Sequence, residues 1–286
     1  PTWLRRNLMP ESTHQTNETL SKLRLNTVCE SAICPNRSEC FARRIATFMI
    51  LGETCTRRCV FCAIQTGKPE LVDPGEPMRV AEAALKLGLR HVVVTSVARD
   101  DLKDEGAEAF CQTIAAIRKI LPEATVEILT PDFHAKTDLI HRVCDAKPDV
   151  FNHNVETIER LSPVVRPQAR YRRSLDVLKK IKEYAPAITT KSGLMLGLGE
   201  TFDEVLTVLT DLREANCDVV TIGQYLKPKD GKLEVTDYIP PEVFSRLAEE
   251  GKRLKFREVY SGPYVRSSYH AGEVFQRSQL EMLEAV

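Results

Sequence analysis

The stretch "IATFMILGETCTRRCVFC", residues 45–62, joins an apolar run to three cysteines. Its first seven residues are apolar or β-branched and predict a buried strand. The cysteines, spaced C-x3-C-x2-C, begin four residues after that run ends. In folds built from parallel strands, reactive groups gather at the carboxyl ends of the strands. The stretch therefore predicts a loop of reactive thiols at a strand end of an α/β protein.

Further apolar runs repeat this pattern along the chain. They predict strands at 91–97, 125–130, 149–155, 189–197 and 218–224. Helical periodicity fills the segments between the strands, and such alternation predicts parallel strands joined by helical crossovers. Polar residues follow four of the six strands, which implies that they line one shared opening at the carboxyl ends of the strands. We therefore expect a partial (β/α)6 TIM-like barrel at 45–225, closed by an N-terminal extension at 1–44 and a C-terminal extension at 226–286.

Composition narrows the class of protein further. The chain has 286 residues, 43% of them hydrophobic and 28% charged, and 40 Lys and Arg balance 40 Asp and Glu. This balance removes the electrostatic argument for a nucleic-acid partner. No run reaches the ~18 apolar residues of a membrane span, and the start lacks the apolar core of a signal peptide. We expect a soluble cytoplasmic monomer without a membrane partner. Because residue 1 is Pro, a mitochondrial or plastid protein whose transit peptide has been removed is the alternative.

The placement of the cysteines favours metal or redox chemistry over disulfides, since six of the nine lie between positions 29 and 62. Cys55, Cys59 and Cys62 are too close together for three separate packing roles. Structural zinc is a rival interpretation, although it usually takes four protein ligands. Three thiolates on a four-iron cluster leave one iron open, and an open iron can bind and reduce a substrate.

An upstream set, Cys29, Cys34 and Cys40, has the spacing C-x4-C-x5-C. A second group of three thiols outside the strand pattern also indicates metal binding. Zinc stays open for this set if a histidine such as His14 or His270 completes the shell.

The loop at 55–62 resembles the signature of the radical S-adenosylmethionine (SAM) superfamily, in which an aromatic residue such as Phe61 precedes the last cysteine. The resemblance implies that the open iron binds the amino and carboxylate groups of SAM, and that electron transfer cleaves SAM to a 5'-deoxyadenosyl radical. It also implies a one-electron reductant, such as ferredoxin or flavodoxin, as a partner.

Both cysteine sets, together with "RSSYHA" at 266–271, resemble the lipoyl synthase family. The resemblance runs from about residue 26 to residue 271 and includes "TVCESAICPN", "VVVTSVARDDL", "PDVFNHNVET", "TKSGLMLGLGE", "TIGQYLKP" and "GPYVRSSYHA". It implies a second 4Fe-4S cluster held by the upstream cysteines and by a serine of R-S-S-Y, for which we favour Ser268 over Ser267. The expected cofactors are thus two 4Fe-4S clusters and SAM.

The same resemblance implies the reaction. The second cluster would donate two sulfur atoms to C6 and C8 of an octanoyl chain that is bound to a lysine of a lipoyl carrier domain or H protein. The expected catalytic residues are Cys55, Cys59, Cys62 and Ser268.

Contacts to SAM are expected at the strand ends, by family position. Thr95 and Ser96 would meet the methionine end, Asn154 and Glu156 the methionine or ribose hydroxyls, and Lys191 a carboxylate. Strand-end hydrogen bonding and helix capping are the alternative roles for the first four. The charged segment 99–101 either meets a carrier domain or SAM, or forms a solvated loop.

Two other readings remain open on the sequence alone. One is another radical SAM sulfurtransferase, such as a biotin synthase-like enzyme, and the other is a non-enzymatic iron-sulfur carrier or zinc-stabilised binding module. The single cysteines Cys111, Cys144 and Cys217 are expected to be core residues. No role is predicted for His91, His134 and His141.

Overall fold

The computed structural model describes residues 1–4, 13–228 and 231–284, and strands alternate with helices along them. Contacts divide the described chain into two compact units. We call residues 13–58 and 62–149 the N-terminal unit, and residues 1–4, 59–61 and 150–284 the C-terminal unit. The domain boundaries expected after residues 44 and 225 stay predictions.

Parallel strands form the sheet of the N-terminal unit. β2 pairs with β5, β5 pairs with β6, and β1 joins the outer edge of β2 antiparallel. A separate pair, β3 and β4, lies on either side of the cysteine loop in sequence. The bounds are β1 (Asn26–Thr27), β2 (Thr47–Ile50), β3 (Thr54–Cys55), β4 (Gln65–Thr66), β5 (His91–Ser96) and β6 (Thr125–Leu129). All four residues of β2 are buried, as the apolar run predicts.

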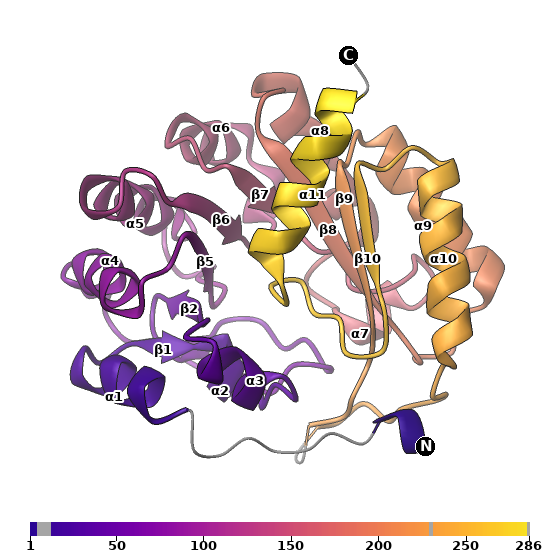
Figure 1. Cartoon of the computed structure of the whole chain (residues 1–286), viewed down its shortest axis with the longest axis horizontal. Coiled ribbons are helices and arrows are strands. Elements are labelled where there is room, and N and C mark those ends of the chain that lie inside the picture. The colour runs from indigo at the N-terminus through magenta and orange to yellow at the C-terminus, as the bar shows by residue number, and fades with distance from the viewer. Residues whose placement is uncertain (5–12, 229–230, 285–286) are drawn as a thin grey trace. The chain divides into compact units, whose positions relative to one another are not determined.

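Helices cover the sheet of this unit. Figure 1 shows α4 (Glu76–Leu87), α5 (Ala107–Ile120) and α6 (Thr137–Asp145) side by side next to β5 and β6. α4 ends because Gly88 adopts a left-handed conformation, with φ 68°, that favours glycine. The upstream segment folds into α1 (His14–Lys22), α2 (Val28–Ser31) and α3 (Arg37–Ala42), and a 3-10 turn, η2 (Phe133–Ala135), follows β6.

Four parallel strands form the sheet of the C-terminal unit in the order β7, β8, β9 and β10. Their bounds are β7 (Val150–Asn152), β8 (Thr189–Leu196), β9 (Val219–Gln224) and β10 (Glu258–Ser261). Every residue of β9 and all but one of β8 are buried, including the polar side chains of Lys191 and Gln224.

The helices of this unit bury a shared core against the sheet. α9 (Phe202–Glu214) begins with a capping box in which Thr201 and Glu204 satisfy each other's backbone N–H groups. Its apolar face packs with residues of α8 (Tyr171–Tyr184) and α10 (Pro241–Arg253). The remaining elements are η1 (Thr2–Leu4), α7 (Ser162–Val165) and α11 (Ala271–Glu284), and α11 contacts β10.

The six predicted strands are present as β2, β5, β6, β7, β8 and β9. The structure adds four short strands that the sequence does not predict, β1, β3, β4 and β10. β10 has only four residues, "EVYS", of which one is buried, and a polar segment this short gives no clear period.

Candidate functional site

The three-cysteine loop leaves the sheet of the N-terminal unit directly after β2. Its two ends are tied together, because β3 pairs in parallel with β4 and Gly67 N–H donates to the Cys55 carbonyl at 3.1 Å. Cys55 and Cys59 are half-buried and Cys62 is exposed, and all nine cysteines of the chain are free thiols. The loop is therefore closed at its base like a hairpin, and Cys62 is its most exposed cysteine.

Backbone N–H groups point at the sulfur atoms of this loop. Cys55 Sγ accepts from Arg57 N–H at 3.4 Å and from Ala98 N–H at 3.3 Å, and Cys62 Sγ accepts from Ile64 N–H at 3.5 Å. Such donors stabilise thiolate sulfur and tune the potential of an iron-sulfur cluster. The donor set therefore fits the three-cysteine cluster that the sequence predicts.

Phe61, the aromatic residue before Cys62, belongs to the C-terminal unit. It packs against a small apolar cluster formed by Val165, Leu198 and Tyr225. The preceding Val60 N–H donates to the Val165 carbonyl at 3.0 Å. The aromatic residue thus anchors the middle of the loop.

The upstream cysteines lie on and between two short helices of the N-terminal unit. Cys29 is on α2 and is buried, Cys40 is on α3, and Cys34 N–H donates to the Cys29 carbonyl at 3.0 Å. Burial, and next the charge of the neighbouring cysteines, raises the pKa of the Cys29 thiol to about 11 and that of Cys40 to about 12. As thiolates, these cysteines would repel one another unless a cation lay between them. This arrangement fits a metal or cluster.

The end of β5 carries two of the expected SAM contacts. Thr95 Oγ1 donates to the Leu129 carbonyl of β6 at 2.9 Å, which is the strand-end role that the sequence left open. Ser96 Oγ is buried and has no hydrogen-bond partner among the residues that the structure describes. A buried hydroxyl in this state costs free energy unless something bonds to it. Ser96 therefore fits a contact to a bound polar molecule.

The other expected contacts gather in the C-terminal unit. Asn154 Nδ2 donates to Glu156 Oε1 at 3.0 Å and lies 2.7 Å from Ser267 Oγ. Burial raises the pKa of the Glu156 carboxyl, and the Arg166 charge and the Asn154 amide oppose that shift. Lys191, on β8, is among the largest fully buried side chains. The structure thus joins Asn154 and Glu156 to the R-S-S-Y segment.

Close packing explains how Ser267 reaches Asn154. Gly193 lies on β8, and a Cβ atom added there would lie 2.9 Å from Ser267 Oγ and 3.0 Å from Asn154 Oδ1. Only glycine leaves room for both side chains. Ser267 is therefore engaged by Asn154, whereas Ser268 follows it in a turn before α11.

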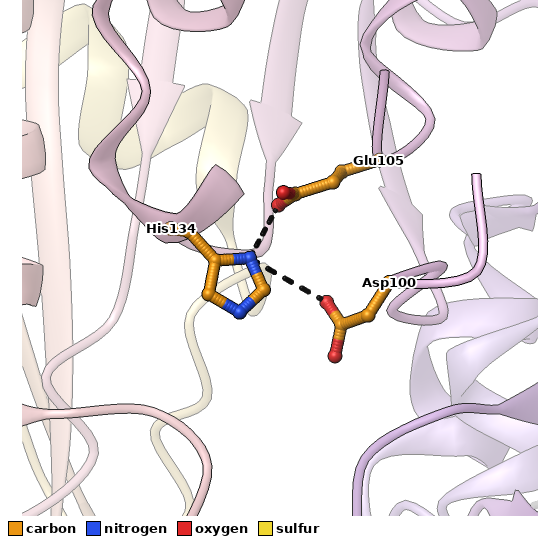
Figure 2. A group of neighbouring side chains, drawn as sticks. All are labelled: Asp100, Glu105 and His134. Carbon is orange, nitrogen blue, oxygen red and sulfur yellow. Dashed lines mark ion pairs between the residues drawn. The ribbon is translucent and has the colours of Figure 1, made fainter. Parts of the chain in front are cut away.

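A charge network in the N-terminal unit was not predicted. Asp100 and Asp101 are exposed. Asp100 nevertheless bonds to Arg57, and Asp101 pairs with the buried Arg99. Asp100 and Glu105 lie in the segment after β5, and His134 lies after β6. Their possible metal-ligand atoms all lie within 4.8 Å of one another, and Figure 2 shows the three side chains pointing toward one another. The signal in the sequence was an arginine inside the cysteine loop and acidic residues after two strands, but neither indicates the pairing.

Comparison with known proteins agrees with this geometry. Residues 49–212 match the model of the radical SAM superfamily. A lipoyl synthase of Caldanaerobacter subterraneus subsp. tengcongensis is 56% identical over 271 residues, which cover 95% of both chains. The chain belongs to the lipoyl synthase family. A second lipoyl synthase, of Rubrobacter xylanophilus, is 54% identical over 256 residues, which cover 90% of this chain and 80% of that protein.

Membership of the lipoyl synthase family confirms several predictions. The protein is a sulfur-inserting radical SAM enzyme, and SAM and a 4Fe-4S cluster are cofactors of that superfamily. The fold is similar to that of methylornithine synthase (PylB), with a TM-score of 0.56, 13% identity and coverage of 93% of this chain and 92% of that one. This likeness confirms a mixed α/β fold consistent with a partial TIM barrel. Within the described ranges, no helix has the length and apolar character needed to cross a membrane.

Proposed function

We propose that the protein inserts two sulfur atoms, at C6 and C8, into an octanoyl chain bound by an amide to a lysine of a lipoyl carrier domain or H protein. The observation that carries this proposal is two separate three-cysteine sets in one chain of the lipoyl synthase family. One set suits a cluster that binds SAM, and the other suits a cluster that donates sulfur.

Radical chemistry is required because no side chain can deprotonate an alkane. When bound, the 4Fe-4S cluster and SAM supply the one-electron chemistry that breaks such C–H bonds. The chain's own residues bind these groups, orient the octanoyl chain and exclude water.

Cys55, Cys59 and Cys62 would hold the cluster that binds SAM. The N–H donors at Cys55 and Cys62 support this role because they favour thiolate over thiol. The exposed position of Cys62 leaves room for a ligand beside the loop.

SAM would contact polar groups at the strand ends. The unpaired hydroxyl of Ser96 supports a hydrogen bond to SAM, and the Asn154–Glu156 pair supports contacts to its hydroxyl or amino groups. Lys191 offers a cation for a carboxylate, and Thr95 shapes the end of β5 through its bond to β6.

Cys29, Cys34 and Cys40 would hold the second cluster, with Ser268 as the fourth ligand. The hydrogen bonds between Ser267 and Asn154 favour Ser268 for this role, since Ser267 Oγ is already engaged. A serine oxygen is a harder and weaker ligand for iron than a thiolate, which suits an iron that must leave when sulfide leaves.

The partners follow from the same chemistry. They are the octanoylated carrier and a one-electron reductant such as ferredoxin or flavodoxin. We further propose that the protein acts as a monomer in the cytoplasm, or in a mitochondrion or plastid if a transit peptide has been removed.

Iron and acid-labile sulfide per chain, measured after anaerobic reconstitution, test this proposal. The chain should bind about eight irons, and the triple variant Cys29→Ala, Cys34→Ala, Cys40→Ala about four, as two cubane clusters require. A matched variant, Cys111→Ala, removes a thiol outside both sets and should keep about eight. About four irons in the unchanged chain, or zinc in place of iron, would remove the sulfur source.

A further inference from the structure

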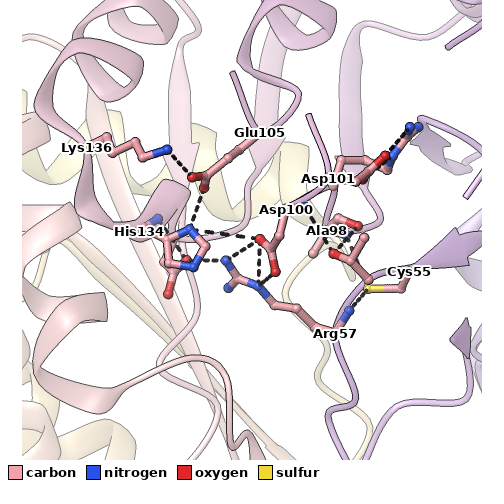
Figure 3. A network of polar contacts seen from close by, with 11 residues as sticks. Cys55, Arg57, Ala98, Asp100, Asp101, Glu105, His134 and Lys136 are labelled. Carbon is pink, nitrogen blue, oxygen red and sulfur yellow. Dashed lines mark hydrogen bonds and ion pairs between the residues drawn. The ribbon is translucent and has the colours of Figure 1, made fainter. Parts of the chain in front are cut away.

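Arg57, inside the cysteine loop, is buried in the N-terminal unit with 5% of its side chain exposed. Its Nε donates to both carboxylate oxygens of Asp100, at 3.1 and 2.9 Å, and its Nη2 lies 2.8 Å from Asp100 Oδ1 (Figure 3). The same Nη2 lies 2.8 Å from Asp132 Oδ1. Bidentate, charge-assisted bonds of this kind fix both the position and the orientation of a guanidinium. These bonds hold the loop against the segments that follow β5 and β6, and we call the contacts of Arg57 with Asp100 and Asp132 the clamp.

Asp132 is delivered to Arg57 by an unusual turn. Phe133, His134 and Ala135 are consecutive non-glycine residues with φ of 44°, 46° and 55°, a region that side chains disfavour. Asp132 is fully buried, and its carboxylate accepts from His134 N–H at 3.1 Å. Phe133 is also fully buried and meets Phe110 edge-on, with ring centroids 6.3 Å apart. Packing and capping thus stabilise a strained turn, and this turn positions the Asp132 carboxylate beside Arg57.

The outer part of the network is already neutralised by protein cations. Glu105 lies 2.9 Å from His134 Nδ1 and 2.7 Å from Lys136 Nζ, and His134 lies 4.0 Å from Asp100. Three carboxylates therefore face an arginine, a lysine and an imidazole. A divalent metal at this cluster would have to displace Arg57 and Lys136, so we interpret the cluster as an outer support for the position of Arg57.

The clamp lies next to the hydrogen bonds that reach the cluster sulfur. Thr56 donates through N–H and Oγ1 to the Ala98 carbonyl, at 3.1 and 3.0 Å, and Asp100 N–H donates back to Thr56 Oγ1 at 3.1 Å. The same two segments supply both N–H donors to Cys55 Sγ. Holding Arg57 against Asp100 therefore also holds these donors on the sulfur.

We infer that Arg57 and Asp132 are positioning residues that fix the cysteine loop and keep two N–H donors on Cys55 Sγ, and so raise the reduction potential of the cluster bound there. The inference rests on the proposed function of Cys55 as a cluster ligand. N–H donors to a ligating sulfur favour the reduced cluster, because they stabilise its added negative charge. A loosened clamp should weaken that stabilisation.

The test uses the triple variant that lacks the upstream cysteines, so that one cluster is observed. In that background we would compare Arg57→Met, Arg57→Lys and Asp132→Asn with the matched control Arg58→Met, which removes an exposed arginine of the same loop. The readouts are iron content, thermal unfolding of the metal-free protein, and the cluster's potential in a redox titration followed by electron paramagnetic resonance.

We expect about four irons in every variant and an unchanged potential in Arg58→Met. Arg57→Met and Asp132→Asn should each lower the potential by the equivalent of about a tenfold change in the reduction equilibrium, or about 59 mV for a one-electron couple. Arg57→Lys should be as thermally stable as the background protein but should have a lowered potential, since an ammonium cannot make the two parallel bonds of a guanidinium.

Each other outcome has a distinct meaning. If the background protein binds no cluster, the proposed function fails. If the clusters form but the Arg57 and Asp132 variants keep the potential of the control, the inference alone fails. If the potential simply follows thermal stability across the variants, with Arg57→Lys restoring both, the clamp is only structural and the positioning role is overturned.

Discussion

Gly193 on β8 offers a sharp test of the C-terminal unit, because three polar side chains close over it. In Gly193→Ala the new Cβ would lie 2.6 Å from Thr221 Oγ1, 2.9 Å from Ser267 Oγ and 3.0 Å from Asn154 Oδ1. Ordinary van der Waals contact begins at 3.4 Å, so each group must move. Overpacking of this kind costs about 1 to 3 kcal/mol, and displacing Ser267 from Asn154 adds about 1 kcal/mol.

The expected result is a loss of about 2 to 4 kcal/mol in the free energy of unfolding, measured by urea denaturation of the metal-free protein. The matched control is Gly262→Ala, since a Cβ there meets Val265 Cγ2 at an ordinary 3.5 Å. This control should change stability by less than 1 kcal/mol. Equal stability of Gly193→Ala and the unchanged protein would refute the close packing of Ser267 and Asn154 on β8.

Further predictions concern packing, acid stability and the single cysteines. Tyr171 Oη donates to Asp211 Oδ2 at 2.8 Å, so Tyr171→Phe should lower the free energy of unfolding in urea by about 1.5 to 3 kcal/mol, and no change would contradict the bond. The Arg160 guanidinium holds the pKa of the Glu204 carboxyl at about 2, below its usual 4.5. The stability that this ion pair contributes is present above pH 4.5 and is lost as the pH falls toward 2, so acid titration of Glu204→Gln should lack that component; an acid transition identical to that of the unchanged chain would argue against it. Cys217 is fully buried, so Cys217→Ala should bind as much iron as the unchanged chain, and a loss of iron would make it a ligand.

Much of the fold can be predicted from the sequence, because most of the buried parallel strands contain runs of apolar or β-branched residues. β2 and the central residues of β5 are β-branched or apolar, which makes both strands recognisable, and the cysteines follow the end of β2. β10 is not recognisable, since its pairing with β9 rather than its own composition makes it a strand. Short, partly exposed strands depend on tertiary contacts that a local pattern does not contain.

The candidate site also has one part that the sequence predicts and one part that it does not. Clustered thiols are visible in sequence because their spacing is local. The Arg57 clamp is not, since Asp100 is 43 residues away and Asp132 depends on a left-handed turn that contains no glycine. Proximity of this kind becomes visible only when the chain is folded. Likewise, only the contact with Asn154 separates the adjacent residues Ser267 and Ser268.

The central claim is that the cluster on the upstream cysteines is the source of the inserted sulfur. The most direct test reconstitutes the protein with isotopically heavy sulfide, removes the free sulfide, and measures the mass of an octanoyl-lysine peptide after a single turnover with SAM and a reductant. The account predicts a product in which both new sulfur atoms are heavy, and no such product from the triple variant Cys29→Ala, Cys34→Ala, Cys40→Ala. A product that carries only light sulfur, or an undiminished yield from the triple variant, would contradict it.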